Sequence, residues 1–188
     1  MEDLFSYERS SVTKTNDKLK PKTAKAIAIG VLKTSKRNEA FKQIIEDAGG
    51  LPTAGNIFDY ILSQFNSPAE MYLATWTISK ANIARLRESV DSGKVNHLCM
   101  VFSSTLKPAN PALYASLMSS LKPLDNVELK EINSHAKTFS ITDGVNYYTV
   151  TGSANWSENP RIENFLILNS KELFYHHKEW MTELTRLA

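Results

Sequence analysis

The sequence predicts an α/β protein whose mixed β-sheet is sandwiched between helices. Two observations predict this fold class. Segments with strand and helix patterns alternate along most of the chain, and a β-hairpin follows them near the C-terminus. In addition, the segment HLCMVFSS at 97–104 carries an uninterrupted apolar run, as expected of a strand in a sheet that is covered on both faces.

In chain order, the first segment is polar and moderately basic. Residues 1–24 are rich in Ser, Thr, Lys and Asp, and we expect a mobile arm there, ahead of a single domain at 25–188. The apolar run at 24–33 predicts either a strand or the start of a buried helix. A helix is predicted at 35–50, because its apolar residues share one face and a pair of glycines ends it.

The middle of the chain alternates between the two patterns. Apolar residues at helical spacing predict helices at 56–65 and 80–95, and a proline at a first helical position opens another at 111–121. The inward-facing residues of the first two helices are predicted to be Ile57, Tyr60, Ile61 and Phe65, and Ile83, Leu86 and Val90. Strands are predicted at 70–79, 97–104 and 126–132.

A hairpin, a strand and a helix complete the predicted fold. The pair Asp143-Gly144 is a favoured hairpin turn, so the segment at 149–155 is expected to run antiparallel to the segment at 135–142. The chain then ends with a strand and a helix, predicted at 164–169 and 171–187.

Composition limits the class of protein more than its function. With 188 residues, 42% of them hydrophobic, the chain can form one domain with a real core. The net charge of +2 neither requires nor excludes a polyanionic partner. The lone cysteine, Cys99, cannot form an intramolecular disulfide and is expected to be a buried hydrophobe. No stretch has the length of a signal peptide or the roughly 18 apolar residues of a membrane helix, so we expect a cytoplasmic protein with no membrane partner.

The hairpin brings together side chains that suit an anion. His135 and Lys137 are two residues apart and would share one face of a strand, and the turn would place Gly152, Ser153 and Asn155 beside them. A lysine charge, neutral donors and a glycine that permits close backbone approach suit a tetrahedral phosphate. A histidine, with an ordinary pKa of about 6.5, can act as nucleophile or acid. The group therefore predicts phosphoryl-transfer chemistry that needs no metal.

This ordered set resembles the signature of the phospholipase D superfamily: His-x-Lys, an Asp a few residues on, and Gly-Ser-x-Asn after the next strand. The matching residues are HAK at 135–137 and GSAN at 152–155, and Glu163 matches an acidic residue that members often carry after the Asn. The resemblance covers 56–188 and implies a phospholipase D-like fold.

The resemblance also implies roles for the matched residues. His135 would be the nucleophile that forms a phosphohistidine, and Lys137 and Asn155 would hold the phosphate oxygens. Ser153 would shape the pocket, and Glu163 would polarise a histidine through its other ring nitrogen. Because single-copy members form homodimers and are typically nucleases, the resemblance implies a homodimer that acts on DNA or RNA, without a cofactor.

Some residues admit two interpretations. Asp143 arrives one residue later than the family spacing, which leads to Thr142, so it is either the motif's Asp or only the hairpin turn. Trp156 either packs in the core or stacks on a base as part of the substrate site, whereas Trp76 is expected in the core. Neighbouring histidines at 176 and 177 would diverge on a helix and do not predict a metal site.

Three functions follow, in order of preference. The first is a metal-independent phosphodiesterase of the nuclease type. The second is a nucleic-acid-binding module of the same fold that has lost turnover, motivated by the shifted Asp143. The third is a phospholipase or phosphatidyl transferase.

Overall fold

The structure is a computed structural model that describes residues 28–31, 53–157 and 163–184, the first of these ranges by its backbone alone. The arm predicted at 1–24 and the helix predicted at 35–50 lie outside these residues. The division of the chain into an arm and one domain therefore stays a prediction.

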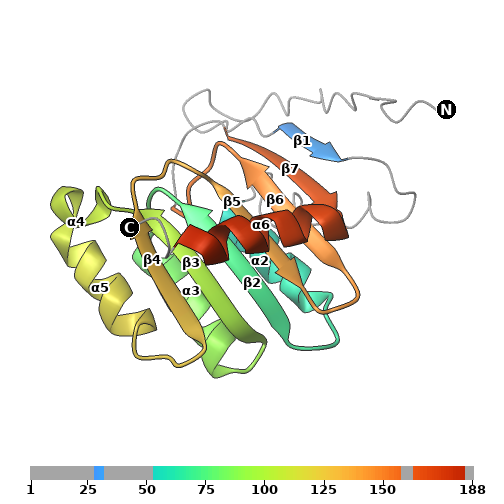
Figure 1. The fold of residues 1–188 in the computed structure, drawn as a ribbon, viewed down its shortest axis with the longest axis horizontal. Helices are drawn as coiled ribbons and strands as arrows, with labels where there is room; N and C mark the ends of the chain where they lie inside the picture. The colour runs from blue at the N-terminus through green and yellow to red at the C-terminus, as the bar shows by residue number, and fades with distance from the viewer. Residues whose placement is uncertain (1–27, 32–52, 158–162, 185–188) are drawn as a thin grey trace, which may run out of the picture.

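One mixed sheet runs through the described part of the chain (Figure 1). Its strand order is β1-β7-β6-β5-β2-β3-β4. Strands β2, β3 and β4 are mutually parallel. Strands β5, β6 and β7 alternate in direction from β2 onward, and β1 is parallel to β7. The strands are β1 (Ala28–Val31), β2 (Ala69–Thr75), β3 (Val95–Ser103), β4 (Val127–Ile132), β5 (Thr138–Thr142), β6 (Tyr147–Gly152) and β7 (Asn164–Asn169).

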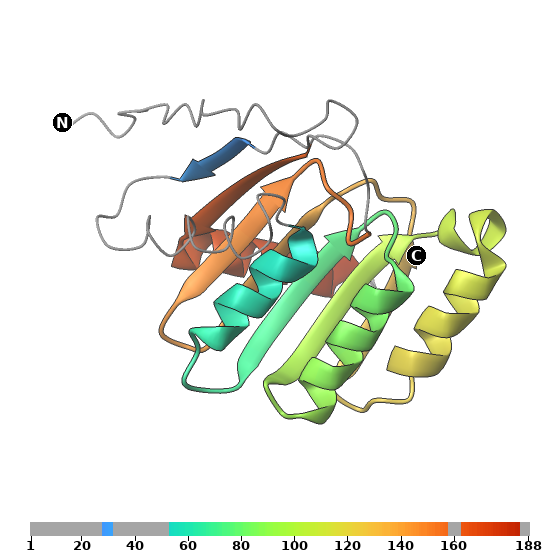
Figure 2. The same ribbon diagram turned by 180° about the vertical axis from the view of Figure 1, so that it is seen from behind.

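Helices cover both faces of this sheet, which confirms the predicted α/β sandwich. The helix α6 lies across one face, and α2 and α3 lie on the other, as the two opposite views show (Figures 1 and 2). The described helices are α2 (Ala54–Ser63), α3 (Lys80–Asp91), α4 (Leu106–Ala109), α5 (Pro111–Leu121) and α6 (Lys171–Glu183). None of them is long and apolar enough to span a bilayer.

Polar side chains define where the helices begin. Thr53 and Asn56 form a reciprocal capping box at the start of α2, so that helix begins two residues before the predicted position. Ser79 and Ser170 accept hydrogen bonds from the backbone in the first turns of α3 and α6. Pro111 stands at the start of α5, as predicted.

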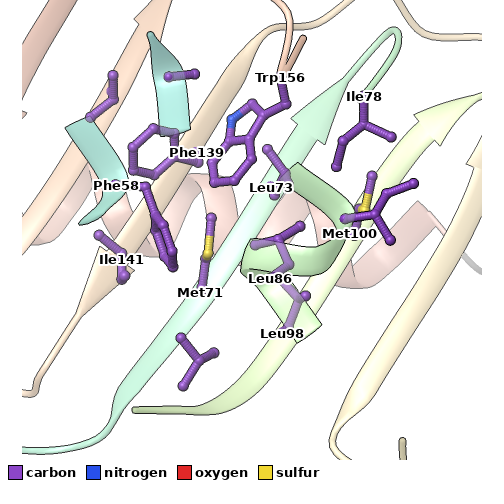
Figure 3. Close-up of a cluster of buried hydrophobic side chains, with 14 of the residues drawn as sticks. Phe58, Met71, Leu73, Ile78, Leu86, Leu98, Met100, Phe139, Ile141 and Trp156 are labelled. Atoms are coloured by element: carbon purple, nitrogen blue, oxygen red, sulfur yellow. The ribbon is translucent and has the colours of Figure 1, made fainter. Parts of the chain in front are cut away.

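The core lies on both sides of β2 and β3. On the α2 and α3 side, Trp156, Phe58 and Phe139 pack together, with ring centroids 5.4 Å apart for Trp156–Phe58 and 5.3 Å for Trp156–Phe139 (Figure 3). On the α6 side, Cys99 packs in a cluster with Phe174. Burial raises the pKa of the Cys99 thiol to about 11, in agreement with the predicted role as a small buried hydrophobe.

Candidate active site

The strand directions collect several distant segments at one edge of the sheet. Strands β2, β3, β4 and β6 end at this edge, while β5 and β7 begin there. Residues that follow β2, β3 and β6 therefore lie near residues that precede β5 and β7. In open α/β sheets, ligands bind in the crevice outside the carboxyl ends of the parallel strands.

The segment at 133–137 crosses this edge. It connects β4 to β5, which are separated in the sheet by β3 and β2, so it passes over the carboxyl ends of both central strands (Figure 1). Three strand spacings correspond to about 14 Å. His135 and Lys137 belong to this crossing segment and not to β5, which begins at Thr138. The prediction that both lie in a strand was therefore wrong.

The two motif residues nevertheless meet. The Lys137 ammonium nitrogen Nζ lies 2.9 Å from His135 Nδ1 and 3.4 Å from Nε2, and it donates to the His135 carbonyl oxygen at 3.0 Å. His135 is exposed and Lys137 is partly buried. Burial lowers the pKa of Lys137, and the negative charge of Glu163 opposes that shift. A cation, an imidazole and a carboxylate thus share this edge.

Pairing between β5 and β6 extends as far as Lys137. The Gly152 N–H donates to the Lys137 carbonyl at 3.3 Å, and the Thr151 hydroxyl donates to the same oxygen at 3.4 Å. The backbone of Lys137 is thus held next to the end of β6, as the predicted hairpin requires.

Ser153 connects the end of β6 to the start of β7. Its hydroxyl donates to the Glu163 carboxylate and accepts from the Asn164 N–H at 3.1 Å, while its own N–H donates to Asn164 Oδ1 at 3.0 Å. Among the described residues of one chain, the hydrogen bond of the Glu163 carboxylate therefore goes to Ser153 and not to His135. The predicted contact from Glu163 to a histidine is not made within one copy of the chain.

Asn155 has an unusual environment for an amide. Its Oδ1 is buried and has no hydrogen-bond partner among the described residues. Leaving such an atom unpaired costs about 1–3 kcal/mol, and isolated cases in native proteins often mark a catalytic or ligand-binding role. Asn155 follows Ser153 by two residues, so this unpaired oxygen belongs to the loop at the same edge.

Gly152 has a different role from the one predicted. A Cβ at this position would lie 1.9 Å from the backbone oxygen of Asn164 and 3.2 Å from the Cα of Phe165. The backbone of β7, and not a substrate, uses the space that the glycine leaves. Gly152 therefore permits strand packing next to the site and does not itself admit a phosphate.

Trp156 is a core residue, which confirms the first of its two interpretations and shows that its place in the substrate site was wrong. Only 2% of its surface is exposed. Its N–H donates to Thr75 Oγ1 at 3.2 Å, and its carbonyl accepts from Ser79 N at 2.8 Å and from Asn82 Nδ2 at 3.0 Å. These bonds anchor the residue that follows Asn155 to the end of β2 and the start of α3.

Asp143 lies at the opposite end of β5. Its Oδ1 accepts from the backbone N–H groups of Val145 at 3.0 Å and Asn146 at 2.7 Å, and Gly144 adopts a φ of 85°. It lies six positions along an extended strand from Lys137, which is roughly 20 Å. Asp143 is therefore a turn residue that does not reach the His135 edge.

Trp76 is the residue that sequence reasoning misplaced most clearly. The prediction put it in the core, yet 39% of its surface is exposed. Its ring centroid lies 5.4 Å from that of His135 at an interplanar angle of 47°, and its Nε1 donates to Thr105 Oγ1 at 3.0 Å. Strand β2 ends at Thr75, so the next residue leaves the buried layer at the site edge.

Other features of the described residues lie away from this edge. No three metal-ligating side chains gather among the residues that the structure describes. His177 Nδ1 accepts a hydrogen bond from Trp180 Nε1 at 2.9 Å, a packing contact on α6. An open groove of about 580 Å³ lies between α3 and α5, where Arg87 pairs with Asp91 and donates to the Ser120 carbonyl.

Comparison with known proteins does not assign this chain to a family. No family model matches the chain, and no curated protein is significantly similar to it. Similar solved structures include polyphosphate kinase from Porphyromonas gingivalis, with 15% sequence identity and a TM-score of 0.48. The match covers 79% of this chain and 21% of that chain, so this chain corresponds to about a fifth of that protein. Function is therefore argued from the site alone.

Proposed function

We propose that this chain is a metal-independent phosphodiesterase that cleaves DNA or RNA through a phosphohistidine on His135. One observation carries the proposal: the His135 ring and the Lys137 ammonium are in contact at the sheet edge where ligands bind in this type of fold. An imidazole beside a fixed cation combines a nucleophile with a group that neutralises charge on phosphate oxygens. Resemblance of the motif to the phospholipase D superfamily supports the same chemistry.

The first step uses the unprotonated nitrogen of the His135 ring. A lysine ammonium only donates hydrogen bonds, so His135 Nδ1 accepts from Lys137 in the present arrangement. A phosphodiester at this edge competes for that ammonium, and Lys137 then binds a non-bridging oxygen. The Asn155 amide nitrogen Nδ2 donates a hydrogen bond to another. The ring nitrogen forms a bond to phosphorus while the bond to the leaving oxygen breaks, and that oxygen takes up a proton.

The second step restores the enzyme. A water molecule attacks the phosphorus of the phosphohistidine and gives a proton to the group that protonated the leaving oxygen, and the bond between phosphorus and the ring nitrogen breaks. The products are a phosphate monoester and neutral His135. Each step is a displacement with no change in oxidation state, so no redox partner is involved.

The leaving oxygen needs a proton donor other than His135, and this need supports a homodimer. The chain has 4 histidines. His97 lies near the start of β3, at the opposite edge of the sheet, and His176 and His177 lie on α6 over one face. One copy therefore brings a single imidazole to this edge. In the proposed enzyme, a second copy related by a two-fold axis supplies the other imidazole, which acts as the acid.

A nuclease assay with a matched variant tests the proposal. Wild type and the His135→Ala and His176→Ala variants are incubated in EDTA with single-stranded DNA, double-stranded DNA and RNA. His176 is the control because it is also an exposed histidine. We expect cleavage by the wild type and His176→Ala, none by His135→Ala, and an acid-labile adduct on His135 in quenched reactions. Full activity of His135→Ala, or loss of wild-type activity in EDTA, would refute the mechanism.

A second function has one observation in its favour. Because the Glu163 carboxylate is bonded to Ser153 within one chain, it does not polarise His135 there. If the same arrangement persists in the dimer, the protein is a nucleic-acid-binding module without turnover. Salt-dependent binding by wild type with no cleavage and no adduct would favour this alternative.

A further inference from the structure

We propose that Trp76 is a stacking surface for the base of an unpaired nucleotide whose phosphate is bound at His135, which makes single-stranded nucleic acid the substrate class. The proposal rests on the proposed function, because it takes the phosphate to be bound beside His135 and Lys137. The proposal adds a contact to the base, which the phosphate-binding residues do not touch.

The position of Trp76 is not explained by the needs of the core. The preceding residues of β2, Leu73, Ala74 and Thr75, are each at most 1% exposed, whereas Trp76 is 39% exposed. Trp76 belongs to neither of the two clusters of buried hydrophobic side chains among the described residues. A large aromatic ring left in contact with water at the edge of a candidate site is a feature of binding surfaces.

The ring is also held in place. Its Nε1 donates to Thr105 Oγ1 at 3.0 Å, and that hydroxyl is hydrogen-bonded to the buried Ser103 Oγ at 2.8 Å. The Thr105 N–H donates to Ser103 Oγ at 3.2 Å, which orients the hydroxyl pair. An aromatic ring that is oriented before the ligand arrives loses little conformational freedom on binding.

The distance to the imidazole suits one nucleotide. The Trp76 and His135 ring centroids are 5.4 Å apart, and the interplanar angle of 47° means that the indole face is not covered by a parallel stack. The base and the phosphate of a nucleotide are joined through one sugar. A phosphate bound at His135 therefore brings its own base, or that of the adjoining nucleotide, to the neighbouring indole.

The geometry distinguishes single strands from duplexes. In a duplex both faces of each base are covered by its neighbours, so no base face is free to stack on Trp76. In a single strand the bases are accessible, and stacking on aromatic side chains tolerates any sequence because every base has a π-face. Trp76 is thus expected to select unpaired strands without selecting a sequence.

Binding measurements on strands with and without bases test this inference. Fluorescence anisotropy gives the Kd of a labelled octathymidylate and of an abasic strand with the same number of phosphates, for wild type, Trp76→Ala and Trp76→Phe. Both strands carry methylene groups in place of the bridging phosphate oxygens that a nuclease would expel, so the wild type cannot cleave them, and a gel confirms that they stay intact. We expect Trp76→Ala to weaken binding of the octathymidylate by about 5- to 150-fold and to leave the abasic strand unchanged. Trp76→Phe should retain most of the affinity.

The other outcomes overturn the inference. An equal loss of affinity for both strands would mean that Trp76 positions His135. No loss of affinity for either strand would mean that no base reaches Trp76. A shift of the Trp76→Ala variant from dimer to monomer in sedimentation would mean that Trp76 is a contact between copies. The cleavage assay tests the proposed function separately from the base-stacking inference. If the wild type binds through Trp76 but does not cleave, only the proposed enzymatic activity is refuted. If the wild type cleaves through His135 but binds both strands with equal affinity, only the base-stacking inference is refuted.

Discussion

Gly152 offers the sharpest test of how the site edge is built. Replacing it with alanine places a Cβ 1.9 Å from the backbone oxygen of Asn164, whereas real Cβ contacts essentially never fall below 3.0 Å. Strands β6 and β7 must therefore move apart by about 1.1 Å there. Overpacking of this kind costs about 1–3 kcal/mol, and weakening of the Ser153 N–H bond to Asn164 adds about 1 kcal/mol.

Urea denaturation measures this loss. With a slope of about 2 kcal/mol/M, a loss of about 2–4 kcal/mol lowers the midpoint by about 1–2 M. Gly144→Ala is the matched control, because its φ of 85° is strained for alanine but nothing lies within 4 Å of the new Cβ. That variant should lose about 1–2 kcal/mol. Because Ser153 and Glu163 adjoin Gly152, the Gly152→Ala variant should also have a lower cleavage rate per folded molecule, whereas Gly144→Ala should not. A Gly152→Ala variant with wild-type stability would refute the strand-packing explanation.

Two further predictions concern charged groups. Burial lowers the pKa of Lys137 and the Glu163 charge raises it, so Glu163→Gln should lower that pKa further. Binding of an anionic strand, which needs the charged ammonium, should then be lost at a lower pH than in wild type, and an unchanged or higher midpoint of the pH–binding curve would contradict this. Lys130 is buried and donates to the carbonyls of Met181 and Thr182 at 2.9 Å each, at the C-terminal end of α6. Lys130→Met should cost about 1–3 kcal/mol and speed amide exchange in the last turns of α6, whereas wild-type exchange there would disprove the capping role.

Most of the fold could be predicted because hydrophobic spacing is a local signal. The uninterrupted apolar run at 97–104 corresponds to β3, whose side chains alternate between the α3 face and the α6 face. The inner faces of α2 and α3 were also recovered in large part: Ile57, Ile61 and Leu86 are buried. Phe58 was not predicted to be buried. It contacts Trp156 and Phe139, and those contacts join segments far apart in the sequence.

The order of the strands could not be predicted in the same way. Nothing local in the segment at 133–137 shows that β4 and β5 are separated by two strands. That separation places His135 over the ends of β2 and β3, in a crossing segment and not in a strand. The same separation brings Trp76 beside His135, although the two residues are distant in the sequence.

The site residues show the corresponding limit. Spacing within the motif correctly predicted that Lys137 and His135 would be close, and that the end of β6 would lie beside them. It did not show what fills the space around each residue. Gly152 was assigned to the substrate as a motif glycine and Trp156 because it follows Asn155, but Asn164 occupies the space at the first and the core encloses the second.

The displaced aspartate of the motif lies at the turn end of the β5–β6 hairpin. The hairpin register pairs Thr138 with Thr151 at the site end and Thr142 with Tyr147 at the turn end. Four residues, 143–146, form the turn. The Thr142 hydroxyl donates to the Asn146 carbonyl and accepts from the Gly144 N–H. The residues between Lys137 and Asp143 all lie in β5, so Asp143 opens the turn, roughly 20 Å from Lys137.

A change at that end leaves the register at the other end intact. The Lys137 carbonyl still pairs with Gly152, and the loop that carries Asn155 is still anchored to Thr75 and α3 through Trp156. Loss of turnover, if it is found, must then arise from groups at the site edge itself. Glu163 is the first to consider, because its hydrogen bond to Ser153 departs from the role that the motif implies for it.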